Sequence, residues 1–472
     1  MPLILGTNSI KGGYEVANSL RFNDGSSEYL NRTLGTPTNN KKWTLSFWFK
    51  KTVNGANPYL FTAYNSSTND NRSWVNFQTD DTMSIAHYDV SAYTWRLVTN
   101  RLFRDPSAWY HIVVAVDTTQ GTAANRVKLY VNGVQETSFS TASYPDQNYN
   151  PQINSAQPHN IGRAHNDSAY VDGYMAETVF IDGQQLTPTS FGEFDEDSPT
   201  IWKPKGLTDD FTFGTNGFHL DFENSSSLGA DVSGNSNNFT VNNLTAIDQT
   251  TDTCTNNFST MNPLDNYYFS GTFSEGNLKV ATNSGVEGYA TNTMPVSTGK
   301  WYWEMKIASS GSNRDQIGIA DKVIDNTDFS PISGNNRYEG YYGYTGNHYS
   351  PDTGNVSYGA TFTAGDIVGV ALDLVNHKLY FHKNGTYQNS GDPTSGSTGT
   401  GAIAVATDPH DGVYYATFAN IHNTASTFEA NFGNPVFTIS SSNSDGNGHG
   451  NFEYAVPSGY FALCSKNLAE FG

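Results

Sequence analysis

The stretch WTLSFWFKK, residues 43–51, alternates apolar and polar side chains along its length. Trp43, Leu45, Phe47 and Phe49 would point to one face, and the positions between them are mostly polar. Successive side chains of a β-strand point to opposite faces of the sheet. This period of two, with one apolar face, therefore predicts a β-strand that packs on a core.

The same period recurs along the first half of the chain. Asn132-Gly133 lies between two such patterns and predicts a hairpin, because a type I′ turn needs positive φ at both residues. The composition, with 28 Tyr, 28 Phe and 44 Gly, is typical of strands and turns. We therefore expect an all-β fold. Further strand-like stretches in this half are WVNFQT (74–79), MSIAHY (83–88), YTWRLVT (93–99) and WYHIVVAVD (109–117).

The 472 residues suit more than one domain. Strand patterns give way to Asn, Ser, Thr and Asp after residue 200 and resume from Tyr267, and between them only HLDFEN (219–224) and NFTVNNLTAID (238–248) look strand-like. KLYVNG and KLYFHKNG, starting at Lys128 and Lys378, are similar strand-to-turn segments in the two halves. We predict a β-sandwich in residues 1–200, a polar connector in 201–265, a second β-sandwich in 266–440 and a C-terminal spacer and anchor segment in 441–472.

Charge and hydropathy exclude two classes of partner. The net charge of −20 would repel phosphate backbones, so we expect no nucleic acid to bind. The longest apolar run, about Ile112 to Val116, is too short to span a bilayer, so we expect no membrane insertion. The first residues also lack the pattern of a secretory signal.

The two cysteines, Cys254 and Cys464, have no metal-ligand spacing. They flank the second strand-rich region. Two outcomes stay open, a disulfide that joins the ends of the second sandwich or two inert thiols, and the second is favoured.

The two halves resemble two families of β-sandwich domains. SLRFNDGSSEYL, WTLSFWFK, WYHIVVAVD, KLYVNG and YVDGYMAETVFIDGQQLTPTSFG, in residues 15–200, resemble laminin-G-like domains of the concanavalin-A-like group. GKWYWEMKI, IGIAD, GDIVGVALDL, KLYFHKNG and EANFGNPVF, in residues 267–438, are similar to SPRY domains. The resemblance implies two concanavalin-A-like jelly-roll sandwiches in tandem.

Residues 233–265 and the C-terminal PSGYFALCSKNL, residues 457–468, resemble segments of structural proteins of marine bacteriophages. This resemblance implies a place on the surface of a phage particle, as a tail fibre or a capsid fibre. The implied partners are other virion proteins, further copies of the chain, and a glycan or protein of the host envelope. A purely structural virion component that packs against neighbouring subunits is the alternative.

Catalytic patterns are weak in this sequence. Some enzymes of this fold carry Glu-x-Asp-x-x-Glu on one strand, but residues 193–198 read EFDEDS, with serine in the last acidic position. No Gly-x-Ser-x-Gly occurs, and His111 opens an apolar strand, which favours a structural role. We expect no enzymatic activity, and an envelope-polysaccharide depolymerase is the distant alternative.

A structural calcium ion is the cofactor that the laminin-G-like resemblance allows. Asn23 with Asp24, or Asp167 with Asp172, could supply the oxygen ligands that calcium needs. The alternative is that these side chains cap turns of their own backbone. We expect no other cofactor.

Aromatic side chains near arginine are the candidate ligand contacts. Tyrosines crowd residues 338–349, and SPRY domains bind partners through loops at one edge of the sandwich. Tyrosine offers a large contact area at a low cost in side-chain entropy. In the first half, Trp95 and Arg96 are a weaker candidate pair. The predicted ligand-binding residues are Arg337, Tyr338, Tyr344, His348, Tyr349, Trp95 and Arg96, and Tyr341 and Tyr342 belong to the same crowded stretch.

Overall fold

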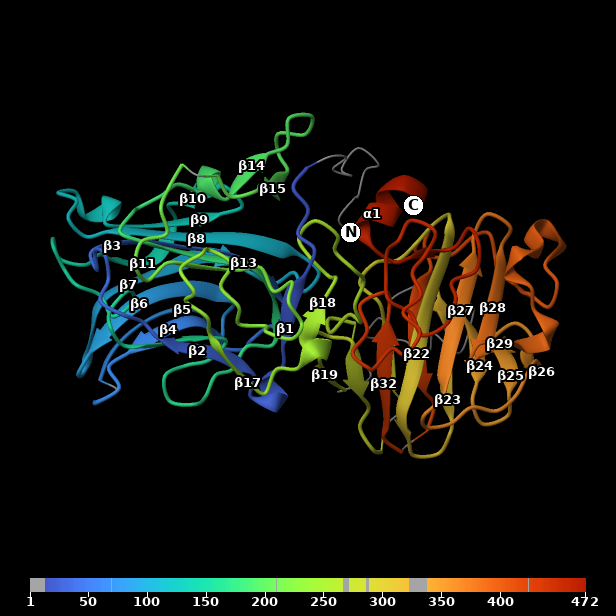
Figure 1. Cartoon of the computed structure of the whole chain (residues 1–472). Helices are drawn as coiled ribbons and strands as arrows, with labels where there is room; N and C mark the ends of the chain where they lie inside the picture. The colour runs from blue at the N-terminus through green and yellow to red at the C-terminus, as the bar shows by residue number, and fades with distance from the viewer. Residues whose placement is uncertain are drawn as a thin grey trace. The chain divides into compact units, whose positions relative to one another are not determined.

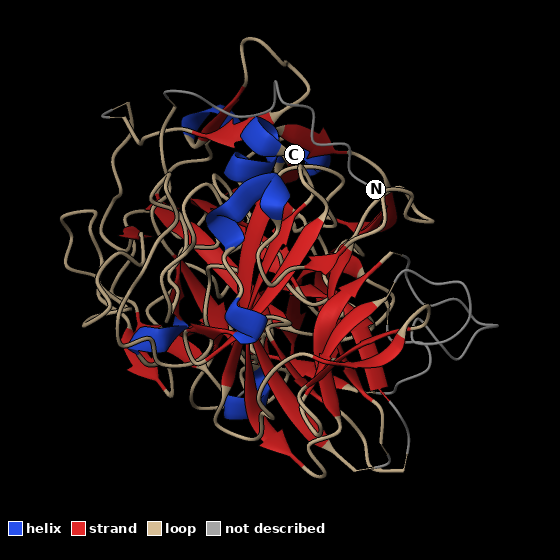
Figure 2. Cartoon of the chain, turned by 90° about the vertical axis from the view of Figure 1, so that its right-hand side faces the viewer, coloured by secondary structure: helices blue, strands red, loops and turns tan. Residues whose placement is uncertain are grey.

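The computed structural model describes residues 13–68, 70–208, 210–265, 271–285, 288–321, 338–422 and 424–472. Strands dominate the chain and its helical segments are short (Figure 2), which confirms the all-β prediction. Two compact units are present, Ile10–Thr255 and a unit that contains Asn256–Gly472 (Figure 1).

Two antiparallel sheets pack face to face in the first unit. Sheet A has the order β10 (Val134–Glu136), β9 (Val127–Val131), β8 (Trp109–Asp117), β3 (Lys42–Lys51), β13 (Gly173–Asp182), β1 (Ser19–Phe22) and β18 (Gln249–Thr250), and β16 (Phe218–Leu220) also pairs with β13. Sheet B has the order β11 (Phe139–Ser143), β7 (Ala92–Leu102), β6 (Thr82–Asp89), β5 (Asn71–Phe77), β4 (Tyr59–Tyr64), β12 (Pro158–Ile161), β2 (Tyr29–Thr33) and β17 (Thr240–Asn242).

Alternating side chains of the two sheets build the core between them. Leu45 and Phe47 of β3 belong to the same buried cluster as Val75 of β5 and Ile85 of β6. The strand predicted for residues 43–51 is confirmed as β3. Asn132 and Gly133, with φ of 48° and 79°, turn β9 into β10 as predicted.

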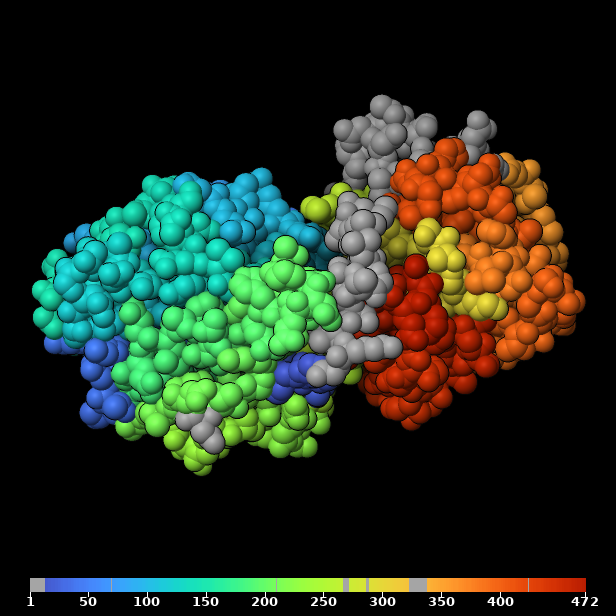
Figure 3. Space-filling view, turned by 90° about the horizontal axis from the view of Figure 1, so that it is seen from above, coloured from blue at the N-terminus to red at the C-terminus, as the bar shows by residue number. Residues whose placement is uncertain are grey.

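Residues 201–255 differ from the predicted connector, because they complete the first sandwich. β15 (Trp202–Pro204) pairs with β14 (Gly192–Phe194), while β16, β17 and β18 pair with β13, β2 and β1. Phe218 and Phe239 lie in the core of the first sandwich, and the green residues of this region lie against its blue and cyan residues in Figure 3. The two strand-like stretches predicted from His219 and Asn238 overlap β16 and contain β17. Their pairing with the first sandwich was not predicted, because strands of two or three residues do not indicate their partners.

A buried ion pair ties the end of this region to β3. The Nζ of Lys50 lies 2.8 Å from a carboxylate oxygen of Asp252, and both side chains are fully buried. The indole nitrogen of Trp109 donates to the other oxygen of Asp252 at 3.1 Å. The carboxylate therefore balances a lysine that sheet A could not otherwise bury.

The second unit is also a sandwich of two sheets around a core. Sheet G has the order β19 (Thr272–Ser274), β20 (Lys279–Ala281), β32 (Ser426–Asn431), β22 (Lys300–Ser310), β27 (Ile367–Asp373), β28 (Lys378–Lys383) and β29 (Thr386–Tyr387), with β30 (Ile403–Ala404) beside β28 and β33 (Phe461–Ala462) parallel to β22. Sheet H has the order β21 (Gly288–Thr291), β31 (Tyr415–Asn420), β23 (Asp315–Ala320), β24 (Glu339–Tyr342), β25 (Asn347–Ser350) and β26 (Gly354–Ser357).

Residues 441–472 differ from the predicted spacer and anchor, because they cover sheet G. Phe452 and Tyr460 pack with Tyr302 in a second buried cluster of this unit. Glu304 of β22 accepts the backbone N–H groups of Glu453 and Tyr454 at 3.0 and 2.8 Å. Burial raises the pKa of Glu304 even though these donors oppose the shift.

The segment ends in α1 (Ser465–Phe471). Short 3-10 turns occur at Asp24–Ser26, Ala123–Asn125, Pro188–Ser190, Ala246–Asp248, Gln388–Ser390 and Pro393–Thr398. No helix in the described part of the chain is long and apolar enough to cross a bilayer.

Both cysteines are free thiols, so the disulfide that the sequence left open is not formed. Cys254 packs beside the buried Trp48 and Trp202 of the first unit, whereas Cys464 lies in the core of the second. Burial raises the pKa of the Cys464 thiol to about 12 and also raises the pKa of Cys254. Neither thiol is therefore ionised near neutral pH.

Buried histidines form part of the polar interior of the first unit. Burial lowers the pKa of His111 to about 3 and the pKa values of His87 and His159 to about 4. Each ring is therefore neutral in the folded protein at pH 5, whereas it binds a proton in the unfolded chain below about pH 6.5.

We predict that Asp252→Ala lowers the unfolding free energy of the first unit by about 3–5 kcal/mol, because Lys50 stays buried without its carboxylate. Denaturation of the full chain in urea would measure the change. Asp197→Ala, at an exposed acid of the β14–β15 turn, is the matched control and should unfold like the wild type. Equal midpoints for the two variants would contradict the role of the pair.

We also predict that the first unit loses stability as the pH falls from 6.5 to 5. The three histidines have lowered pKa values in the fold, so the stability that their neutral forms allow is complete above pH 6.5 and declines below it. The decline should reach roughly 1–2 kcal/mol per histidine by pH 5. Urea midpoints at pH 7, 6 and 5 test this, and a flat profile would disprove it.

Candidate functional site

The structure separates the residues predicted as a ligand surface in the second unit. Tyr338 is fully buried and packs with Tyr289 and Ala419, and its burial raises the pKa of its hydroxyl. A ring without an open face offers a ligand no stacking surface. Arg337, predicted as its neighbour in the site, lies outside the described residues.

The remaining residues of that stretch lie in different surroundings. His348 is buried and forms an ion pair with Glu339, and Tyr349 is half-buried beside Tyr338. Tyr344 is 53% exposed, with the guanidinium of Arg314 at 5.1 Å from its ring centre. Tyr344 alone among the predicted tyrosines of this stretch presents most of a ring to solvent.

The predicted pair in the first unit divides between the two faces of β7. Trp95 is 1% exposed and lies in the core, so its ring is not available at the surface. Arg96, the next residue, points to the opposite face of sheet B, as the alternation of a strand requires. Its guanidinium donates to Gln78 at 2.8 Å and to Ser84 at 3.4 Å.

Arg96 belongs to a continuous group of side chains on the outer face of sheet B, which we call the arginine–aromatic cluster. Arg72, Trp74, Tyr88 and Arg96 alternate with core residues along their strands. Tyr59 and Tyr93 share the same face because register shifts place them opposite Asn76 and Tyr88. The members of the cluster are Tyr59 of β4, Arg72 and Trp74 of β5, Tyr88 of β6, and Tyr93 and Arg96 of β7.

Cross-strand register brings the cluster together. Arg72 is opposite Tyr88, and Tyr88 is opposite Tyr93, so the three side chains lie in one row across β5, β6 and β7. The guanidinium of Arg72 lies 4.6 Å from the Tyr88 ring centre, and that of Arg96 lies 4.7 Å from the Tyr93 ring centre. Such stacking orients a guanidinium and its donors.

Trp74 occupies the centre of the cluster. Its ring centre is 5.8 Å from that of Tyr59 and 5.9 Å from that of Tyr93. The indole nitrogen is buried and donates to no acceptor among the described residues. Burial raises the pKa of the Tyr59 hydroxyl, while the charges of Arg72 and Arg96 act in the opposite direction. Both cations therefore act on the same small area.

Exposure differs across the cluster. Tyr93 is 48% exposed, whereas its neighbours are half-buried or covered by one another. Further aromatic and basic groups extend the face toward β2, where the guanidinium of Arg163 lies 3.6 Å from the ring centre of Tyr29. Most of this surface is not among the predicted ligand contacts, although residues 74–79 and 83–88 alternate between two faces and carry Trp74 and Tyr88 on the outward one.

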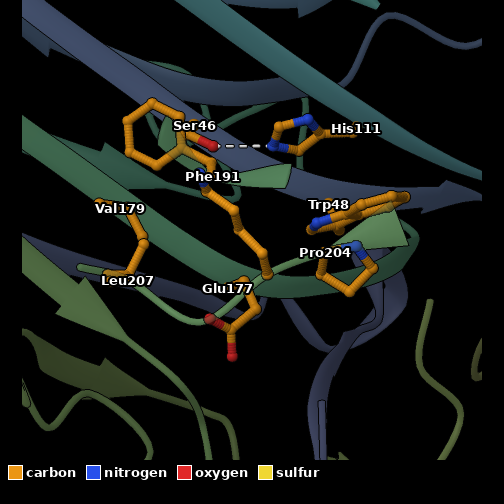
Figure 4. A pocket seen from close by; sticks show the side chains of 9 residues that line it. Ser46, Trp48, His111, Glu177, Val179, Phe191, Pro204 and Leu207 are labelled. Atoms are coloured by element: carbon orange, nitrogen blue, oxygen red, sulfur yellow. Dashed lines mark hydrogen bonds between the residues drawn. The ribbon is translucent and has the colours of Figure 1, made fainter. Parts of the chain in front are cut away.

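A small cavity lies on the other sheet of the same unit, under the β14–β15 hairpin. Ser46, Trp48, His111 and Glu177 line it from sheet A, and Phe191, Pro204 and Leu207 of the segment that covers this sheet close its other side (Figure 4). Its volume is about 10 Å³, room for about one water molecule.

The cavity contains a serine–histidine pair that cannot act as nucleophile and base in this arrangement. Trp202 donates its indole N–H to Nδ1 of His111 at 2.9 Å. The neutral ring therefore carries its proton on Nε2, and that nitrogen donates to the Ser46 hydroxyl at 2.9 Å. A nitrogen that already holds a proton has no lone pair to accept the serine proton.

The acidic stretch 193–198 forms a turn. Asp195 accepts the N–H groups of Asp197 and Ser198 and binds Lys203 at 3.2 Å. The hydrogen bond from Lys203 is the main reason that the pKa of Asp195 is lowered. These interactions stabilise a loop rather than a pair of carboxyl groups facing a substrate.

The predicted calcium ligands also have structural partners. Asn23 caps a 3-10 turn through Gly25, and Asp172 accepts the Thr52 hydroxyl at 2.9 Å. Asp167 pairs with Arg163, and Asp24 is exposed. No group of three or more His, Cys, Asp or Glu side chains suited to a metal ion occurs among the described residues.

Comparisons with known proteins agree with the two sandwiches. Residues 24–189 match the concanavalin A-like lectin/glucanases superfamily, and residues 300–433 match the SPRY domain. The dual specificity protein kinase splA of Dictyostelium discoideum is 36% identical over 110 residues, which are 22% of this chain and 4% of the kinase. Ran-binding protein 10 of Danio rerio is 30% identical over 131 residues, which are 26% of this chain and 21% of that protein.

These relatives are therefore matched over a small part of their length. The crystal structure of the SPRY domain of human HERC1 has 18% identity and a TM-score of 0.29, and the alignment covers 36% of this chain and 96% of that domain. Both family matches fall within sandwiches whose strands have been described above. The chain thus carries a concanavalin A-like domain and a SPRY domain in tandem, two folds that suit binding to a carbohydrate or a protein.

Proposed function

We propose that the first sandwich binds a carbohydrate on the arginine–aromatic cluster. The observation that carries this proposal is the continuous row of Arg72, Tyr88 and Tyr93 with Trp74 beside it, on a sheet face that packs on no core. Aromatic faces stack on the apolar faces of sugar rings, and their polar atoms bind hydroxyl groups. Tyr, Trp and Arg are also the residues that dominate binding energy at interfaces.

A sheet face that contacts only water does not require a contiguous group of aromatic and arginine side chains. Single exposed apolar residues are common on protein surfaces, whereas a contiguous patch is characteristic of a binding site. Trp74, which is buried at the centre of the cluster, supports the rings of Tyr59 and Tyr93 from beneath and so fixes their orientation. Preformed stacking among the rings also lowers the entropy that binding would otherwise cost.

We further propose that this binding acts at the surface of a phage particle, as part of a tail fibre or capsid fibre that contacts the host envelope. The support is the likeness of residues 233–265 and 457–468 to structural proteins of marine bacteriophages. Under this proposal the other partners are virion proteins and further copies of the chain.

We propose a non-enzymatic role for the same domain. The proton arrangement of Ser46 and His111, and the structural partners of Asp195, support this. A depolymerase would need a pair of carboxyl groups or an activated nucleophile facing a substrate cleft.

We expect Tyr93→Ala to abolish binding to purified host-envelope polysaccharide while the melting temperature stays within about 2 °C of the wild type. The reason is that a 48% exposed ring contributes more to a ligand than to the core. Isothermal titration and thermal melting of the full chain would provide the two measurements.

Tyr344→Ala is the matched control, because Tyr344 is an equally exposed tyrosine in the second sandwich. It should bind the polysaccharide like the wild type. If Tyr93→Ala retains full affinity, the cluster is not the binding site, and a structural role for this face is favoured.

A further inference from the structure

We propose that the ligand of the arginine–aromatic cluster is an acidic glycan, a saccharide chain that bears carboxylate or sulfate groups. This inference rests on the proposed carbohydrate binding and names its chemical class. It derives from the charges on the face and from what binding would do to Arg96.

The local charge of the cluster is opposite to that of the protein. The chain carries 45 Asp and Glu against 25 Lys and Arg. The outward positions of β4, β5, β6 and β7 carry Arg72 and Arg96. The acidic residue of these strands is Asp89, the last residue of β6. By the alternation of the strand it lies on the same side as the core-facing Ile85 and His87, away from the two arginines. A cationic area on an acidic surface attracts anions selectively.

Arg96 has neutral hydrogen-bond partners. It donates to the amide oxygen of Gln78 and the hydroxyl of Ser84, and no carboxylate pairs with it among the described residues. By contrast, Arg101 at the end of the same strand binds Glu136 at 2.8 Å, and Arg104 binds Asp81 at 2.9 Å. The charge of Arg96 is therefore not compensated by an ion pair within the part of the chain that the structure describes.

A ligand that covers Arg96 must replace the water around this charge. A neutral sugar would leave the half-buried guanidinium without a counter-ion, and desolvation of an unpaired charge is costly. A carboxylate or sulfate would accept paired N–H bonds from the guanidinium fork instead. Stacking on Tyr93 already orients this fork.

The two arginines lie on strands that are separated by β6. Two interstrand spacings place their backbones about 10 Å apart across the sheet. Arg72 is in register with Tyr88 and Tyr93, whereas Arg96 is in register with Ala86 and Trp74 in a neighbouring row. Each guanidinium stacks on one tyrosine of the first row, Arg72 on Tyr88 and Arg96 on Tyr93. Two such pairs on neighbouring strands fit a chain that runs across the strands, stacks its sugars on the tyrosines and places an acid group at each arginine.

A nucleic acid also combines acid groups with rings that stack. The proposal favours a glycan because a net charge of −20 repels a long polyanion, and the cluster offers two cations rather than a basic groove.

The experiment measures binding of the full chain to four probes by isothermal titration at 50 and 300 mM NaCl. The probes are an oligogalacturonide that carries carboxylates, a chondroitin sulfate oligosaccharide, a neutral cello-oligosaccharide of matched length and a single-stranded DNA 12-mer. We expect at least one acidic oligosaccharide to bind ten times or more tighter than the neutral one at low salt, and this preference to shrink at high salt.

Variants assign the preference to the cluster. Arg96→Gln and Arg72→Gln should each weaken acidic-probe binding about tenfold and weaken neutral-probe binding by a clearly smaller factor, so that the preference for the acidic probe falls. Arg96→Lys keeps the charge without the planar fork and should fall between Arg96→Gln and the wild type. Arg101→Gln, which removes an equal charge from the same strand outside the cluster, should bind like the wild type. Circular dichroism melts confirm that each variant folds.

The outcomes separate this inference from the proposed function. If a saccharide binds and Tyr93→Ala abolishes its binding, but Arg96→Gln and Arg72→Gln bind acidic and neutral probes as the wild type does, the carbohydrate site stands and the acidic specificity is wrong. If no saccharide binds, or Tyr93→Ala has no effect, both proposals fail. Tighter binding of the DNA than of any saccharide would overturn the glycan in favour of a nucleic acid.

Discussion

Burial of both faces of β3 is the constraint on which the first sandwich depends. Its inward residues, such as Phe47, lie in the core, while its outward residues Ser46, Trp48 and Lys50 are buried as well. A strand in the middle of a sheet can be buried on both faces only if another part of the chain covers the outer face of that sheet. Residues 183–255 supply that cover, and Asp252 makes the burial of Lys50 tolerable.

Sheet B has the opposite condition. Its inner face shares the same core, but the outward side chains of β4, β5, β6 and β7 pack mainly on one another. The outer face of sheet B is therefore the one on which a ligand could bind, because residues 183–255 cover the outer face of sheet A. The cavity beneath the β14–β15 hairpin agrees with this division: it holds one water at most, and its histidine is held in one tautomer by Trp202.

The sequence predicted those parts of the fold that have a clear period of two. Residues 43–51 and the Asn132-Gly133 turn were predicted from pattern alone, since alternation and positive φ leave a signal in a single segment. β16 and β17 overlap stretches that looked strand-like, but their place in the first sandwich was not predicted, because their partners β13 and β2 lie far away in the sequence. β18 was missed, because two residues cannot show a period. The C-terminal segment was missed for a related reason: its contacts with Tyr302 and Glu304 are made by loop backbone and by scattered aromatic residues.

The candidate site was predictable only in part, and its parts show why. Arg96 was identified beside Trp95, but only the alternation along β7 decides which of the two faces outward. The crowded tyrosines of residues 338–349 looked like a surface, yet Tyr338 faces packed neighbours and Tyr344 faces solvent. Arg72 and Tyr88 could not be joined to Arg96 without the register of three strands, which a linear sequence does not state.

In the second sandwich, as in the first, a segment late in the unit covers the outer face of one sheet and is held there by buried polar side chains, although the residues differ. The N–H of Gly385 donates to Nδ1 of His382, so the ring carries its proton on Nε2 and donates to the Tyr302 hydroxyl, which donates to Glu304. Glu304 then holds the backbone of residues 453 and 454 over sheet G. In both units a buried histidine, fixed in one tautomer, thus lies where a late segment closes the outer face of one sheet. Because such a histidine must stay neutral, its conservation in relatives would reflect closure of the sandwich rather than catalysis. Ligand contacts should be sought on the sheet whose outer face is not covered by a late segment among the described residues.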